Sequence, residues 1–143
     1  MLIWGRIYST KYRLMSKLWV GKREEVAQIM QRAALFIMPS QWYEGFPKVI
    51  VESIAVGTPI IASKLGAMAE IIIPGVNGYH FQTGDAQDLA AVVQHSLGDP
   101  NRLQQLRQTT RADYEQKYTA EINYQMLMDI YGKAITHRES QNV

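Results

Sequence analysis

The sequence contains no cysteine, few histidines and little excess charge. The absence of cysteine excludes a disulfide framework, thiolate metal sites and a cysteine nucleophile. Its three histidines, His80, His95 and His137, lack the spacing of metal ligands or of a catalytic triad, so we expect them to be structural or exposed. A net charge of +2 is too small to indicate nucleic acid binding, and we expect no nucleic acid partner.

Long hydrophobic segments are also absent. Uninterrupted apolar runs stop at six or seven residues, far short of the roughly 20 that cross a bilayer. The opening residues, MLIWGR, reach a charge too early for a signal peptide. We therefore expect no transmembrane segment and a cytoplasmic location, with peripheral contact to a membrane through a larger assembly left open.

The chain does contain a regular alternation of short apolar runs and helical segments. We expect strands at 2–4, 18–20, 35–38, 60–63 and 79–81, and helices at 24–34, 48–56, 66–72, 86–97, 100–117 and 122–131. This alternation predicts an α/β fold, with a Rossmann-like parallel sheet flanked by helices. At 143 residues the chain is the size of one domain, which we place at 1–137, followed by a frayed tail over 138–143.

The stretch PSQWYEGFPKVIVESIAVGTPIIAS, residues 39–63, holds most of the residues that indicate chemistry. The β-branched run 49–51 alone would favour a strand. Pro47 suits a helix start and Gly57 suits the left-handed position past a helix end, so we predict a helix between them. The loop before this helix then lies at the carboxyl ends of the parallel strands, where such sheets bind ligands.

Two carboxylates, Glu44 and Glu52, flank the predicted helix start. Glu52 interrupts an apolar run and needs a partner or a ligand; a salt bridge to Lys48 is the competing explanation. The amides at Gly45, Phe46, Lys48 and Val49 would form an anion site. Such a site could hold a diphosphate at the amides, a diol at one carboxylate and a second polar group near the other. A nucleotide-sugar combines these three groups.

This stretch, together with LGAMAEIIIPGVNGYHF and GDAQDLA behind it, resembles the carboxy-terminal, donor-binding domain of GT-B glycosyltransferases, specifically the retaining family four. The resemblance covers roughly 19–97. It implies a hexosyltransferase of polysaccharide biosynthesis that works without a metal or another cofactor. The donor would be a UDP-sugar or a GDP-sugar, and the acceptor a glycan or a lipid-linked glycan.

The resemblance also implies residue roles. Glu44 matches the glutamate that places the donor sugar and steadies the reacting centre, and is the catalytic candidate. Glu52 matches the glutamate that accepts hydrogen bonds from the ribose. Gly45, Phe46, Lys48 and Val49 match contacts to the diphosphate and the sugar, and the loop that includes Gly21 matches the region that holds the base. No metal ligand is implied.

The sequence departs from the family in two respects. It has no counterpart of the amino-terminal, acceptor-binding domain, so we expect a truncated C-terminal half of a GT-B fold that is inactive without a separate or missing partner domain. Arg6 and Lys11 have the spacing of the family's diphosphate clamp but lie too close to the strand at 18–20, which favours surface charges. The alternative is a non-catalytic remnant or interaction module that keeps the fold.

Other candidates remain open or weak. Trp42 and Tyr43 could stack on a ligand or line the wall of the cleft. Ser40 favours a turn or capping role, and Glu70 a structural one. The stripe of Met126, Ile130 and Tyr131 indicates core or a docking face for another domain.

Overall fold

The structure, a computed structural model, describes residues 23–141. The expected strands at 2–4 and 18–20 lie outside this range, as do Arg6, Lys11 and Gly21. The described elements, in chain order, are α1 (Arg23–Arg32), β1 (Phe36–Met38), α2 (Lys48–Ala55), β2 (Ile60–Ser63), α3 (Gly66–Ile71), β3 (Gly78–Phe81), α4 (Ala86–Leu97), α5 (Pro100–Lys117) and α6 (Ala120–Gln141).

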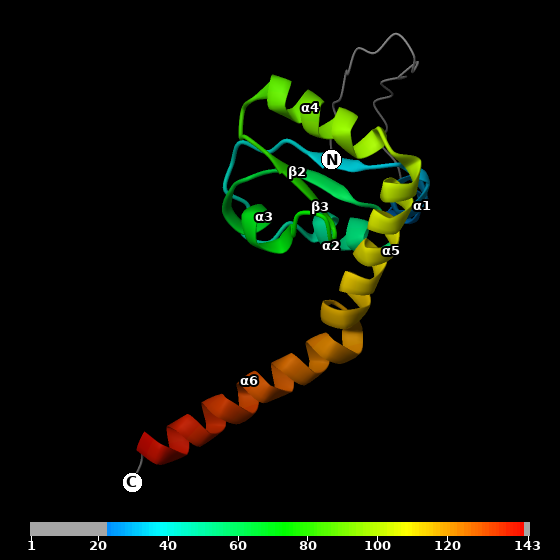
Figure 1. Ribbon diagram of the computed structural model, residues 1–143. Helices are drawn as coiled ribbons and strands as arrows, with labels where there is room; N and C mark the ends of the chain where they lie inside the picture. Colours follow the sequence, from blue (N-terminus) through cyan, green and yellow to red (C-terminus); the bar gives the residue numbers. More distant parts are fainter. Residues whose placement is uncertain (1–22, 142–143) are drawn as a thin grey trace.

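The three strands form one parallel sheet in the order β1-β2-β3 (Figure 1). Ile37 is paired with Ile61, and Ile61 with Tyr79, so the strands are in close register. Because all strands run the same way, Met38, Ser63 and Phe81 end at one edge, which we call the carboxyl edge. This confirms the predicted α/β fold with a parallel sheet flanked by helices.

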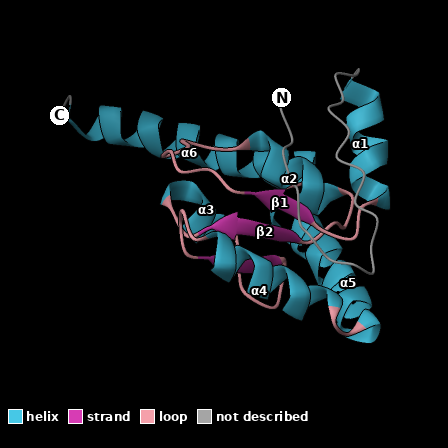
Figure 2. Ribbon diagram, turned by 90° about the horizontal axis from the view of Figure 1, so that it is seen from above, coloured by secondary structure: helices cyan, strands magenta, loops and turns pink. Residues whose placement is uncertain are grey.

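Helices cover both faces of the sheet, which makes three layers (Figure 2). On one face, Ile60 and Ala62 pack with Ile50 and Ile54 of α2 in a buried cluster that also reaches α1, α3 and α5. On the other face, Ile61 packs with Phe81 and with Val93 of α4. Alternate residues of β2 therefore enter opposite clusters, as the two-residue period of a strand requires.

The β-branched run 49–51 is helical, as the stop signals predicted. Ile50 and Ile54 are one helical turn apart and fully buried, so α2 is fixed by packing rather than by local propensity. The helix ends at Ala55, one residue earlier than predicted, and Gly57 follows with a φ of +71°. Pro47 lies at the N-cap, just before the first helical residue.

The turn before β3 uses its three small residues in different ways. Only Gly75 has a positive φ, at +79°. Gly78 is needed for close approach, because a Cβ there would lie 1.9 Å from the Ile60 carbonyl oxygen. Asn77 is fully buried, and its Nδ2 donates to the Ile71 carbonyl and to Asp113, each at 2.9 Å.

The last two helices differ in their relation to the sheet. α5 packs along the body, while α6 extends away from it (Figure 1). α6 continues through residues 138–141, part of the expected tail. Met126, Ile130 and Tyr131 are exposed, so of the two alternatives for this stripe the docking face is left and the core is not. Within the described residues, no helix combines the length and apolarity needed to cross a membrane.

Candidate functional site

The carboxyl edge brings the candidate residues of the central stretch together. The loop 39–47 leaves β1 there and leads directly into α2. Glu44, Gly45 and Phe46 are exposed on this loop, while Pro47 is buried and fixes the point where the loop enters the helix. The predicted site residues between Glu44 and Glu52 therefore occupy one continuous surface.

Ser40 holds the loop in shape. Its hydroxyl oxygen accepts a hydrogen bond from the Trp42 N–H at 3.3 Å and lies 3.4 Å from Glu44 Oε1, to which the hydroxyl can donate. This is the turn role expected for Ser40. It also orients the Glu44 carboxylate beside the turn.

The start of α2 is open to a ligand. Pro47 has no side chain that could accept from the first amides of the helix, and no acidic residue lies in the first turn. α4, which begins at the same edge, is capped by Asp85, whose Oδ1 accepts from Gln87 and Asp88. The amides near Lys48 and Val49 thus present the partial positive charge of a helix N-terminus without a protein acceptor from the N-cap.

Glu52 lies on the same helix, one turn beyond these amides. It is half-buried, and neighbouring Ser53 is fully buried with its hydroxyl donating to the Thr58 carbonyl at 2.9 Å. Side chains in a helix lean toward its N-terminus. The Glu52 side chain therefore leans along α2 toward its uncapped first turn.

One residue that sequence reasoning missed is Ser63, the last residue of β2. Its Oγ is buried and has no hydrogen-bond partner among the described residues. Unpaired buried hydroxyls are uncommon and call for an explanation. The signal in the sequence was the single polar residue that ends the run Ile60–Ser63 at the edge where a ligand would bind.

The remaining candidates lie elsewhere or serve the fold. His80 Nε2 lies 3.1 Å from the Met68 carbonyl oxygen, His95 packs edge-to-face with Tyr79, and His137 and Glu70 are exposed. Among residues 23–141, no group of three or more His, Asp or Glu side chains is placed to hold a metal ion. Gly21 is outside the described range.

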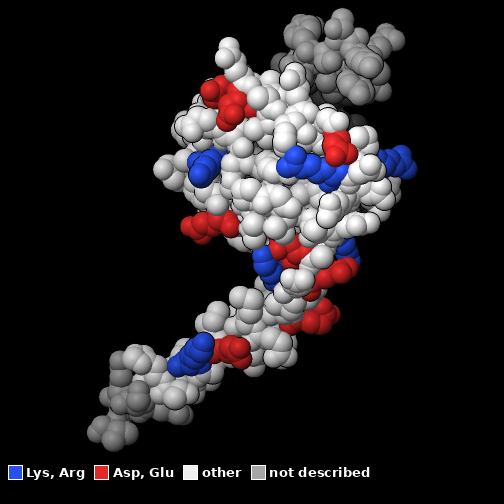
Figure 3. All heavy atoms as spheres, viewed as in Figure 1, with Lys and Arg blue, Asp and Glu red and all other residues white. Residues whose placement is uncertain are grey.

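A second hollow, formed by residues of the described range, differs in its chemistry. An open hollow of about 380 Å³ lies near the far end of α2, and its lining contains no carboxylate: Ala27, Gln28, Gln31, Ala55, Val56 and Arg111. On the face seen in Figure 3, acidic and basic side chains of the described residues are interspersed without a broad patch of one sign. Within residues 23–141, the carboxyl edge differs from this hollow in that it combines an uncapped helix start with carboxylates.

Comparisons with known proteins identify the family of the chain. The sequence model of the family described as "Glycosyl transferases group 1" matches residues 12–113. The glycogen synthase of Mycobacterium tuberculosis is 33% identical over 101 residues, which cover 71% of this chain and 23% of that protein. The chain therefore spans about a quarter of the length of this relative.

Solved structures give the same result. The structure of Anabaena HepE in complex with UDP matches with a TM-score of 0.70 at 28% identity, over 77% of this chain and 30% of that one. The sucrose-phosphate synthase of Thermosynechococcus elongatus matches with a TM-score of 0.72 at 29% identity, over 80% and 28%. With its parallel sheet and a family match over most of its length, the chain belongs to the group 1 glycosyl transferases of the GT-B fold.

Proposed function

We propose that this chain is the donor-binding part of a retaining glycosyltransferase, and that it holds a nucleotide-sugar at the carboxyl edge. The observation that carries the proposal is the uncapped start of α2, which lies between the exposed Glu44 and the half-buried Glu52. The relatives support it, because HepE has been solved with UDP and with UDP-glucose. A uridine diphosphate donor is the first one to test.

Each residue has a role in this proposal. The amides near Lys48 and Val49, with Gly45 and Phe46 before them, hold the diphosphate against the helix N-terminus. Glu52 accepts hydrogen bonds from the two ribose hydroxyls, which a carboxylate can do with its two oxygens.

Glu44 lies beside the sugar and is the catalytic residue. Its carboxylate positions the sugar hydroxyls and stabilises the positive charge that develops at the anomeric carbon.

The chemistry follows from the same arrangement. In the transfer of a hexose, the bond between the anomeric carbon and the diphosphate oxygen breaks, and a bond to an acceptor hydroxyl oxygen forms. Charge accumulates on the leaving diphosphate, where the amides and dipole of α2 stabilise it without having to reorganise. This lets the reaction proceed without a metal ion, with retention of configuration as the proposed outcome.

Calorimetric titration of the chain with UDP, UDP-glucose and GDP tests the donor site. We expect Glu52→Ala to weaken binding of the preferred nucleotide by about tenfold or more, because charged hydrogen bonds to the ribose are lost. Glu121→Ala, an exposed carboxylate on α6, is the matched control and should bind like the wild type. Absence of binding to all three ligands, or equal affinities of wild type and Glu52→Ala, would contradict the proposal.

We further propose that transfer requires a second, acceptor-binding domain, and that the acceptor is a glycan or a lipid-linked glycan. Mixing the chain with the remaining part of a full-length relative should then restore sugar transfer from the preferred donor. Substituting Glu44→Gln in the restored enzyme should lower kcat while donor affinity changes little. If no domain restores transfer although the donor binds, the alternative of a non-catalytic remnant that keeps the fold is favoured.

A further inference from the structure

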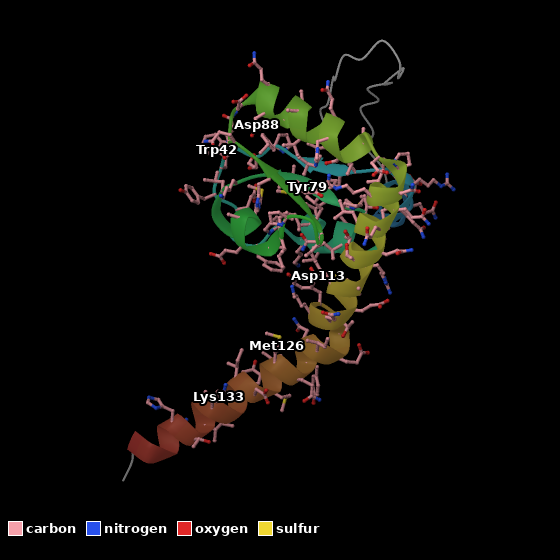
Figure 4. The ribbon with its side chains drawn as sticks, viewed as in Figure 1. Trp42, Tyr79, Asp88, Asp113, Met126 and Lys133 are labelled. Carbon is pink, nitrogen blue, oxygen red and sulfur yellow. The ribbon has the colours of Figure 1, made fainter. Side chains whose placement is uncertain are left out.

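Two aromatic side chains next to Glu44 are almost fully exposed. Trp42 is 80% exposed and Tyr43 82%, higher values than those of any other large apolar residue among 23–141. Figure 4 shows Trp42 at the carboxyl edge, on the outside of the body. Exposed apolar side chains that adjoin a functional site mark a binding surface more often than isolated ones do.

Local contacts hold the part of the loop that carries these rings. Ser40 bonds to the Trp42 backbone, as described above, and Tyr43 lies over the start of α3, where a Cβ on Gly66 would come within 3.1 Å of the Tyr43 ring. Gly66 has a φ of +52°, so the chain there favours glycine and leaves room for the ring. The rings are therefore exposed although the loop that carries them makes these contacts.

The chemistry around the rings selects among possible occupants. The loops and first helical turns at this edge carry Glu44, Asp85 and Asp88 against Lys48 and Lys64. An aromatic pair that enters an anionic lipid surface is accompanied by an excess of basic residues. Among the residues that the structure describes at this edge, there is no such excess.

A sugar ring fits better. A pyranose has a face of C–H groups, which packs on an aromatic ring, and a rim of hydroxyl groups. Gln41 and Gln82 are exposed on the two adjoining loops, and a Cβ on Gly84 would lie 3.8 Å from Gln41 Nε2, so these loops are close together. Flat rings edged by amide groups match both parts of a pyranose.

We propose that Trp42 and Tyr43 form a carbohydrate-binding platform that binds part of the acceptor glycan and thereby adds to the contacts of the second domain, with one pyranose ring on the aromatic pair next to Glu44. This assignment rests on the proposed function, because it places the acceptor hydroxyl beside a donor sugar held at the start of α2. It makes residues 41–43 determinants of acceptor choice. The donor affinity of the chain is independent of them.

Titration of the chain with maltoheptaose and with laminarihexaose tests the platform. The signal to follow is the isotope-labelled indole N–H of Trp42, identified by its loss in Trp42→Phe. We expect one of the two glycans to shift this signal, and Trp42→Ala and Tyr43→Ala each to weaken its binding about tenfold. Tyr124→Ala, a matched exposed aromatic on α6, should bind the glycan like the wild type.

Parallel titrations with UDP separate the two proposals. If UDP binds and neither glycan does, or if the glycan binds equally to wild type and Trp42→Ala, the platform is overturned while the donor site stands. If a glycan binds through Trp42 and Tyr43 but UDP does not, the platform stands and the donor site falls. Shifts of the Trp42 signal by anionic phospholipid vesicles, without any by glycans, would assign the rings to a membrane and overturn the proposal.

Discussion

α5 and α6 follow each other in the sequence, yet their compositions would suggest the opposite arrangement. The polar helix α5 is attached to the body, and the more apolar helix α6 is exposed. α5 is polar and carries few large apolar residues, but it is fixed to the body at several points. α6 carries seven large apolar residues that are exposed: Tyr124, Met126, Leu127, Met128, Ile130, Tyr131 and Ile135. Figure 1 shows the contrast, with α5 along the sheet and α6 directed away from it.

The polar side chains of α5 explain its attachment. Arg107 donates to the carbonyls of Ala33 at 2.6 Å and Gln31 at 2.8 Å, and Arg111 donates to the Ala55 carbonyl. Asp113 accepts from Asn77. These contacts hold the segments that lead into β1, β2 and β3, at the edge opposite the candidate site. α5 is therefore fixed by hydrogen bonds from its polar side chains as well as by a few apolar contacts with the core, and apolar composition alone does not decide which helix is attached.

Of the substitutions that test the contrast between α5 and α6, removal of the Asp113 carboxylate should have the largest effect on stability. Asp113 is nearly fully buried and also pairs with Lys117 at 2.5 Å, so Asp113→Ala leaves the buried Asn77 amide without one acceptor. We expect the free energy of unfolding, measured in urea, to fall by about 2–3 kcal/mol. Glu115→Ala removes an exposed carboxylate from the same helix and should cost less than about 1 kcal/mol. Equal losses in the two variants would show that α5 is not fixed through Asp113.

Substitution of the exposed α6 residues should have a much smaller effect. Ile130→Gln and Met126→Gln alter side chains that are more than half exposed and far from the sheet. We expect the free energy of unfolding in urea to change by less than about 0.5 kcal/mol. A loss of 2 kcal/mol or more, comparable with that expected for Asp113→Ala, would mean that α6 packs against the body in solution.

The smallest expected effect is a pH dependence at the junction of the two helices. Burial raises the pKa of Tyr118, and the nearby Asp113 carboxylate adds to the rise. A raised pKa in the folded state favours the neutral phenol. The stability it contributes is therefore complete below the ordinary pKa of 10.0 and is lost as the pH rises through the folded value. Tyr118→Phe should flatten this decline in urea unfolding between pH 9 and 11, and an unchanged profile would contradict the assignment.

The sequence predicted the alternation of strands and helices better than it predicted the contacts that fix α5 to the sheet. The parallel α/β arrangement and the helix start at Pro100 appear as expected, because each depends on local residues. Asn77 and Asp113 are 36 residues apart. Neither has a local signal for burial, and their pairing exists only once β3 and α5 are in place.

Two features near the candidate site could not be predicted from the sequence. Ser63 looked like the end of an apolar strand, and its unpaired hydroxyl becomes visible only when the neighbouring strands enclose it. The role of Trp42 and Tyr43 was open, since exposure cannot be read from residue type.

The position of the α5 contacts has a consequence for how this protein can change. The hydrogen bonds of Arg107, Arg111 and Asp113 lie at one edge of the sheet, and the exposed loop residues 41–46 lie at the other. Altering Gln41, Trp42 or Phe46 therefore leaves those bonds in place. Protein engineering or natural variation can therefore change the ligand preference of this loop while the hydrogen bonds of α5 continue to stabilise the fold.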